Sequence, residues 1–307
     1  MATILKQQRL LGFVLVITGA ILWGVGGVMS QYLFQKAHIS VNWLVAVRLL
    51  ISGALLIMIS ALTNGKRTFT LWRSKHTVFQ VIVYGILGML AVQYTFMASI
   101  NYGNATVATL LQYLGPVVII LYLVLRKVIP LQFKEIMAVI LALVGSFLLL
   151  TNGSISELSV PLPAIFWGLG SALALAFYTL YPAKLLAQWG SVNIVGWAML
   201  IGGITLSIFY PPWDVDTAGW TPFIYVLLFC AIIFGTMFAF WFFIASLQYL
   251  YPQESSLLGT IEPLTALVVS VLWLGDSFGP WQLLGVGMII FMVVFLSVMN
   301  LQFKCNT

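Results

Sequence analysis

Ten long apolar segments, joined by short connections, run through this sequence and are compatible with one class of fold. The segments cover about residues 12–34, 41–62, 77–99, 104–125, 132–150, 162–187, 191–210, 221–246, 253–274 and 280–301. Each is close to the roughly 20 apolar residues that a helix needs to cross a bilayer. Hydrophobic residues make up 62% of the chain and charged residues 7%, whereas about a quarter of the residues in a soluble domain are charged. We therefore expect an all-α polytopic membrane protein with ten transmembrane helices.

The basic residues indicate how the segments are oriented in the membrane. Of the 13 lysine and arginine residues, eleven fall on one side if the N-terminus is cytoplasmic, while Lys36 falls outside and Arg48 lies within a segment. The eleven are Lys6, Arg9, Lys66, Arg67, Arg73, Lys75, Arg126, Lys127, Lys134, Lys184 and Lys304. Because cytoplasmic loops carry an excess of basic residues, we expect a multi-pass protein of the cell membrane with both termini inside. The same loops account for the net charge of +6, so no nucleic-acid partner is expected.

The chain also carries an internal repeat. Residues 88–116 align without a gap on residues 235–263, at an offset of 147. The matched pairs include Gly88 with Gly235, Phe96 with Phe243, Tyr102 with Tyr249 and Pro116 with Pro263. Earlier in each half, Trp23-Gly24 matches Trp167-Gly168 at an offset of 144. Five segments in each half is an odd number, so we expect residues 1–152 and 153–307 to form two inverted five-helix repeats, as in transporters that expose one site to each side in turn.

These motifs, in this order, resemble the drug/metabolite transporter superfamily, specifically its EamA branch. The resemblance is carried by Ala-Ile-Leu-Trp-Gly at 20–24 with its near copy at 164–168, by Arg48-Leu49-Leu50, and by the small-residue-rich fourth and ninth segments with their prolines. The ninth segment ends as Leu272-Trp273-Leu274-Gly275-Asp276, whereas the first copy has Leu125-Arg126-Lys127 where the family often has an acidic residue after Leu-Gly. The resemblance covers the whole chain and implies transport of amino acids, amines, carboxylates or related metabolites. It also implies that helices 1–4 and 6–9 enclose the cavity and that helices 5 and 10 brace it.

Two residues that are charged at neutral pH lie deep within the segments, Arg48 and Glu262. From the helical rise, Arg48 is roughly 12 Å from the outer end of its helix and Glu262 about 15 Å from the inner end of its own. Ionisable groups at such depth usually bind or conduct something, and Pro263 after Glu262 is expected to kink the helix and free a carbonyl. Two interpretations stay open. The pair binds a zwitterion between its two charges, or it holds the helices together as an ion pair, as a protonated acid or as an arginine bonded to carbonyls.

Further candidates for substrate binding are aromatic and polar residues placed by the repeat. Trp23 and Trp167 occupy matched positions, as do Tyr94 and Trp241 at the 147 offset. Four aromatic rings facing one cavity would enclose an aromatic or cationic substrate, although most aromatic residues in such a protein pack or lie at the membrane interface. Gln112, Tyr113 and Thr260 flank the two prolines and offer hydrogen bonds. The glycine-rich Gly24-Val25-Gly26-Gly27 lies within a membrane segment, where helix packing or a hinge explains it better than phosphate binding.

No catalytic or cofactor motif is apparent, and two cysteines provide neither a disulfide framework nor a metal cluster. We therefore predict a non-enzymatic secondary transporter, an exporter of small metabolites such as amino acids or amines, that needs no cofactor. Its partners are the lipid bilayer and a small-molecule substrate, with a proton as the coupling ion and a second copy of the chain as open alternatives. Multidrug efflux or facilitated uniport on the same fold is the second hypothesis. An intramembrane lipid-modifying enzyme or a scaffold is less favoured, because neither needs two opposed faces.

Overall fold

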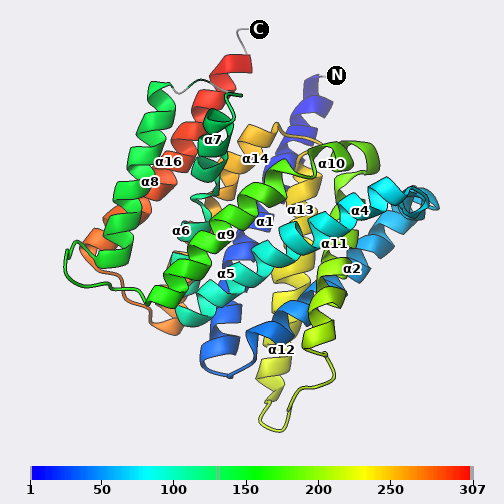
Figure 1. Ribbon diagram of the computed structural model, residues 1–307, viewed down its shortest axis with the longest axis horizontal. Helices are drawn as coiled ribbons and strands as arrows, with labels where there is room; N and C mark the ends of the chain where they lie inside the picture. The colour runs from blue at the N-terminus through cyan, green and yellow to red at the C-terminus, as the bar shows by residue number, and fades with distance from the viewer. Residues whose placement is uncertain (1, 129, 131, 305–307) are drawn as a thin grey trace.

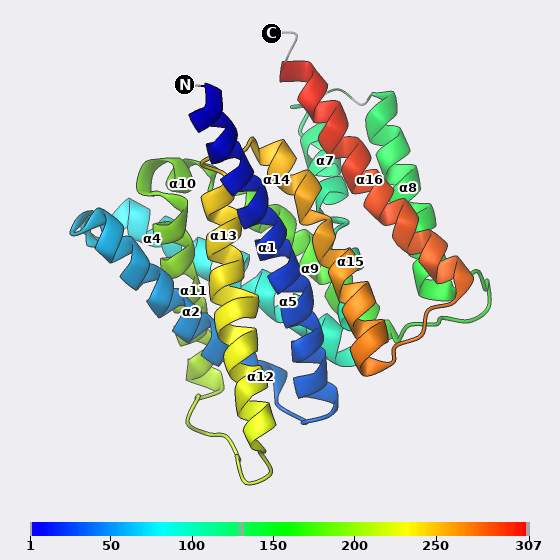
Figure 2. The same ribbon diagram turned by 180° about the vertical axis from the view of Figure 1, so that it is seen from behind.

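The computed structural model describes residues 2–128, 130 and 132–304, and its regular structure over these residues is helical (Figures 1 and 2). Within them, nine helices are long and apolar enough to cross a membrane, and the apolar helix Glu135–Thr151 is shorter. The first five segments are α1 (Ala2–Gln35), α2 (Val41–Asn64), α4–η2–α5 (Lys75–Val83, Tyr84–Leu90, Ala91–Tyr102), α6–α7 (Ala105–Gln112, Gly115–Leu125) and α8 (Phe133–Thr151). The other five are α9 (Leu162–Leu180), α11 (Ser191–Phe209), α12–η3–α13 (Pro222–Ile232, Ile233–Phe238, Ala239–Ser246), α14–α15–η4 (Pro252–Gly259, Ile261–Val269, Ser270–Leu274) and α16 (Pro280–Lys304). The ten predicted segments are thereby confirmed.

Three of the predicted segments are each divided into two helices, and a proline lies close to each division. The fourth segment breaks between α6 and α7, three residues before Pro116, and the ninth breaks at Thr260, three residues before Pro263. A proline removes one backbone donor and its ring clashes with the carbonyl four residues earlier. The sixth segment was predicted to run to residue 187. That was wrong, because α9 ends at Leu180 ahead of Pro182 and the chain continues as the separate helix α10 (Ala183–Trp189).

The packing of the helices follows the inverted repeat. The second and seventh segments pack together as α2 and α11, the fifth and tenth as α8 and α16, and the fourth contacts the ninth through α6 and α15. The first segment packs on the eighth, as α1 on α13, and the sixth packs on the third, as α9 on α5. Figures 1 and 2 show α8 and α16 side by side at one edge of the bundle. Three of these contacts thus join corresponding segments of the two halves, and the contact of α1 with α13 is the counterpart of that of α9 with α5, as expected for two repeats of opposite orientation.

Glycines let α1 lie unusually close to its neighbours in the second half. A Cβ atom built on Gly26 would be 2.7 Å from the Cα of Gly235, and one built on Gly24 would be 2.6 Å from the carbonyl oxygen of Glu262. Small residues at helix contacts allow backbones to approach and pack in a membrane, where apolar side chains gain nothing by leaving lipid. Gly24 and Gly26 thus serve helix packing, one of the two roles predicted for this stretch.

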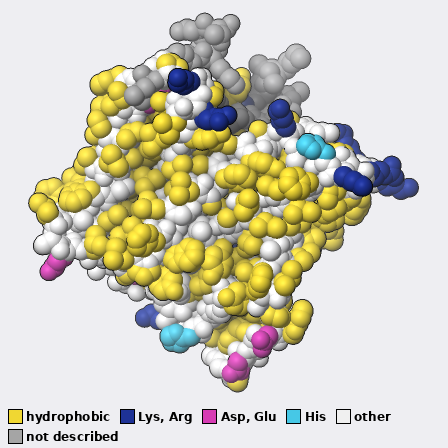
Figure 3. All heavy atoms as spheres, in the orientation of Figure 1, with side chains coloured by type: hydrophobic (Ala, Val, Ile, Leu, Met, Phe, Trp, Pro, Cys, Tyr) yellow, Lys and Arg dark blue, Asp and Glu magenta, His cyan; other side chains and the backbone are white. Residues whose placement is uncertain are grey.

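The charged side chains gather at the two ends of the molecule (Figure 3). Lys and Arg side chains gather at the end where both termini lie, most of the visible Asp and Glu side chains lie at other edges, and a broad hydrophobic belt separates them. Both termini at one end agree with an even number of spans. Which end faces the cytoplasm remains a prediction from the basic loops.

Candidate functional site

The fourth and ninth segments, which break near Pro116 and Pro263, meet inside the bundle. Pro263 has no N–H group, so the carbonyl oxygen of Gly259, four residues earlier, has lost its helical donor. The hydroxyl of Tyr113, at the break between α6 and α7, donates to this oxygen at 2.7 Å. Tyr113 corresponds to Thr260 under the repeat, so a residue at the break in the first half completes the hydrogen bonding at the break in the second half.

Glu262 lies beside the same hydroxyl. It is in the first turn of α15, it keeps only 9% of its surface exposed, and its Oε2 atom is 3.3 Å from the Tyr113 hydroxyl oxygen. The positive end of the helix dipole at this first turn favours a carboxylate. Tyr113 has one hydroxyl proton and two acceptors in reach, the Gly259 carbonyl and the Glu262 carboxylate. The cluster can therefore exchange a hydrogen bond when the carboxylate gains or loses a proton.

Arg48 and Glu262 are not bound to each other. Arg48 is 5% exposed, and its Nη1 atom donates to the sulfur of Met97 at 3.0 Å, while its Nε atom is buried without a hydrogen-bond partner. Among the described residues, no carboxylate lies within 4.0 Å of the guanidinium group. The structural ion pair considered from the sequence is therefore not formed, and Arg48 makes no hydrogen bond to a backbone carbonyl of the described residues.

The four symmetric aromatic residues divide into separate clusters. Tyr94 and Trp167 contact each other with ring centroids 5.6 Å apart, and the Tyr94 hydroxyl donates to Asn42 at 2.8 Å. The ring of Trp23 packs instead on Phe240 and Phe243 of α13. Trp241, on the same helix, stacks with Phe238 and contacts Phe242 in a tilted arrangement. The structure therefore brings together one residue from each matched pair, Tyr94 and Trp167, and gives Trp23 and Trp241 phenylalanine neighbours.

The remaining candidates lie at the two helix breaks. Gln112 is the last residue of α6 and is half-buried. Thr260 is buried, and its hydroxyl donates to the carbonyl oxygen of Leu257 at 2.6 Å, within its own helical turn. In the chain, Gln112 precedes Tyr113 directly and Thr260 lies two residues before Glu262. A local hydrogen bond occupies the Thr260 hydroxyl.

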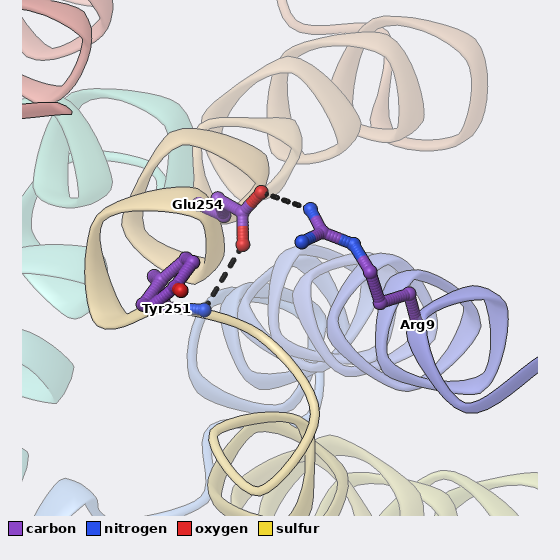
Figure 4. A network of polar contacts seen from close by, with 3 residues as sticks. All are labelled: Arg9, Tyr251 and Glu254. Atoms are coloured by element: carbon purple, nitrogen blue, oxygen red, sulfur yellow. Dashed lines mark hydrogen bonds and ion pairs between the residues drawn. The ribbon is translucent and has the colours of Figure 1, made fainter. Parts of the chain in front are cut away.

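Two polar contacts that the sequence does not reveal tie the first segment to the ninth and to the connection that follows it. Near the termini, Arg9 of α1 pairs with Glu254 of α14 at 2.5 Å, and Glu254 also accepts from the Tyr251 backbone N–H at 3.0 Å (Figure 4). At the opposite end of α1, Gln31 donates to Asp276 at 3.1 Å and accepts from the Ala105 N–H at 2.8 Å. The partners in each contact are 245 residues apart, so only the folded chain shows that they meet.

A cavity of about 310 Å³ lies among the connections at the end away from the termini. Its lining includes His38, Trp43, Asp214, Asp216 and Trp220, and Trp43 holds one wall by donating to the Pro212 carbonyl oxygen at 2.7 Å. None of the residues predicted to bind substrate lines this cavity. Among the described residues, no group of three or more His, Cys, Asp or Glu side chains is placed to hold a metal ion.

Comparison with known proteins supports the resemblance found in the sequence. The family model described as EamA-like transporter family matches residues 10–151 and again residues 162–298. The uncharacterized inner membrane transporter YicL of Salmonella typhimurium (strain LT2) is 33% identical over 287 residues, which cover 94% of this chain and 95% of that protein. A protein crystal structure also superposes with a TM-score of 0.63 at 15% sequence identity, over 97% of this chain and 99% of the other. At that identity the likeness concerns the fold alone.

Proposed function

The chain belongs to the EamA-like transporter family, and we propose that it is a secondary-active transporter that exports small metabolites, such as amino acids or amines, by alternating access. It is a multi-pass membrane transporter, as its family and its apolar helices show. Substrate, direction and mechanism belong to the proposal.

The observation that carries this proposal is the meeting of the two interrupted helices at Glu262. A buried carboxylate, a tyrosine hydroxyl 3.3 Å away and a carbonyl oxygen freed by proline lie together where the two halves contact each other. Broken helices at the interface of inverted repeats provide ion and substrate sites in secondary transporters, because their free backbone groups can bind ligands inside the membrane. An ionisable residue at membrane depth is costly and is retained for function.

The packing supports a division of labour between the helices. Around the break that carries Tyr113 and Glu262, α6 and α15 pack on each other and on α1, α5 and α9, whereas α8 and α16 pack mainly against each other at the edge of the bundle, where α16 also contacts α14 (Figure 2). A rocking motion between the halves would change the contact between α6–α7 and α14–α15 while α8 and α16 stay paired. In this scheme Glu262 carries either the coupling proton or a substrate ammonium group, and Tyr113 responds to its charge.

Glu262→Gln tests the proposal, because the amide keeps the size and most hydrogen bonds of the side chain and cannot ionise. The variant is reconstituted in liposomes with a panel of radiolabelled amino acids, amines and carboxylates, and flux is measured with and without a proton gradient. We expect near-normal melting in detergent and loss of gradient-driven flux. Tyr113→Phe, which removes only the hydroxyl, should reduce the same flux less severely.

Glu254→Gln is the matched control, since it removes a carboxylate from the start of the same segment, about two helical turns before Glu262. An exposed ion pair such as Arg9–Glu254 contributes about 0–1 kcal/mol to stability, so the control should melt and transport much like the unmodified protein. Full gradient-driven flux by Glu262→Gln would refute a working role for that carboxylate. Equal losses of gradient-driven flux in both variants would show that removing either carboxylate has the same effect, and that Glu262 has no special role.

A further inference from the structure

Arg48 is a buried cation without an anionic partner among the described residues. It is 5% exposed, lies within α2 in the membrane part of the chain, and is the one lysine or arginine that lies deep within a predicted segment. A guanidinium group carries five N–H donors and stays charged in proteins. Here one donor is used on the thioether sulfur of Met97, a weak acceptor, and the Nε–H has no partner.

The carboxylates of the chain are engaged elsewhere or lie in the connections. Glu254 pairs with Arg9, Glu262 lies at Tyr113, and Asp276 accepts from Gln31. Glu135 accepts from the Gln132 backbone N–H at the start of α8. Among the described residues none of them comes within 4.0 Å of Arg48. Leaving a charge buried without a partner is strongly unfavourable. Helix packing therefore does not explain why an arginine occupies this position.

We infer that Arg48 is the binding site for a single carboxylate group of the transported substrate. This deepens the proposed function and rests on it, because it assigns the substrate class. The planar fork of the guanidinium matches a carboxylate and can bind it through two parallel hydrogen bonds. One cation balances one negative charge, so a monocarboxylate is a better match than a phosphate dianion.

The neighbourhood of Arg48 suits the rest of such a molecule. Met97, which holds Nη1, is one helical turn from Tyr94 on α5, and residues three apart lie on the same helix face. Tyr94 contacts Trp167 of α9 and bonds Asn42 of α2, the helix that carries Arg48. The apolar body of a carboxylate-bearing ligand would thus lie against a methionine and an aromatic pair.

The experiment compares matched ligands. The common amino acids are each paired with the amine that lacks the carboxyl group and with the acid that lacks the amino group. Binding is read from the concentration dependence of the melting temperature of the purified protein in detergent, since a ligand of the folded state raises it. We expect every stabilising ligand to carry a carboxylate, and the corresponding amines to have no effect.

Arg48→Met removes the charge and keeps a long apolar side chain. We expect roughly 10- to 100-fold weaker binding of the carboxylates, the factor that a hydrogen bond to a charged group represents. Without ligand, the variant should melt no lower than the unmodified protein, because an unpaired buried charge has been removed. Arg48→Lys, which keeps the charge and loses the fork, should bind carboxylates with intermediate affinity and provides the measurement if the methionine variant fails to fold.

Arg9→Met is the control, since it removes an arginine that is 49% exposed and remote in sequence from α2, and it should leave carboxylate binding unchanged. Stabilisation by amines as strong as by acids, unchanged carboxylate binding by the Arg48 variants, or no carboxylate that stabilises the unmodified protein would each overturn the inference. The binding assay uses no gradient. Carboxylate binding through Arg48 without any transport in liposomes would therefore contradict the proposed function and leave the binding site in place.

Discussion

Replacing Gly24 with alanine should push α1 away from the helix that carries Glu262. A Cβ atom at this position would be 2.6 Å from the Glu262 carbonyl oxygen and 2.8 Å from the Cβ of Thr265. Favourable carbon contacts begin at about 3.5 Å, so α1 and α15 must separate by a large part of an ångström. Overpacking of this kind costs about 1–3 kcal/mol, and because one of the atoms is backbone, no side chain can turn aside to relieve it.

Gly27→Ala in the same helix supplies the matched control. There the nearest atom to the added Cβ is the Cβ of Ala105, at 3.6 Å, which is an ordinary contact. Both variants gain the same intrinsic helix preference of alanine over glycine, about 1 kcal/mol, so this contribution cancels when the two are compared. We expect Gly24→Ala to be less stable than Gly27→Ala by about 1–3 kcal/mol.

The assay is reversible unfolding in mixed micelles with increasing sodium dodecyl sulfate, followed by circular dichroism. A second readout is gradient-driven flux, which should fall in Gly24→Ala because the displaced α15 carries Glu262 away from the Tyr113 hydroxyl. Equal unfolding free energies for the two alanine variants would refute the reasoning, since the close approach of α1 to α15 would then have no energetic consequence.

Two further predictions concern orientation and the symmetric aromatic residues. In a background without Cys230 and Cys305, a cysteine in the Asp214–Gly219 loop should react with an impermeant maleimide added outside intact cells, whereas one at Gly65 should not; labelling of both from the same side would contradict the positive-inside assignment. Trp23→Ala and Trp167→Ala should weaken ligand binding, measured by thermal shift, more than Trp72→Ala does, because Trp72 packs on Trp197 among the basic connections. If all three changes weaken binding equally, the matched tryptophans serve packing alone.

The sequence by itself determined the features that depend on one helix at a time. Segment length follows from the thickness of the bilayer, and every backbone group inside it must be bonded within the segment, so ten apolar runs of this length predict ten helices. Pro116 and Pro263 mark where the fourth and ninth helices break because the effect of a proline is local. The odd number of segments in each half required an inverted repeat. The same locality made Pro182 the informative residue at the end of the sixth segment, where a longer helix was expected.

Only the tertiary structure decided which side chains meet. In a membrane protein the lipid-facing and buried faces of a helix are both apolar, so the pattern of residues does not show how each helix is rotated toward its neighbours. Glu262 was found from its depth and its proline, but its partner Tyr113 lies 149 residues away in another helix. Arg48 and Glu262 have charges that sum to zero, which suggested a pair, yet the helix packing keeps them apart and gives Arg48 a methionine sulfur in place of a carboxylate. Contacts of this kind depend on the rotation and crossing of helices, and these are set by the packing of the whole bundle.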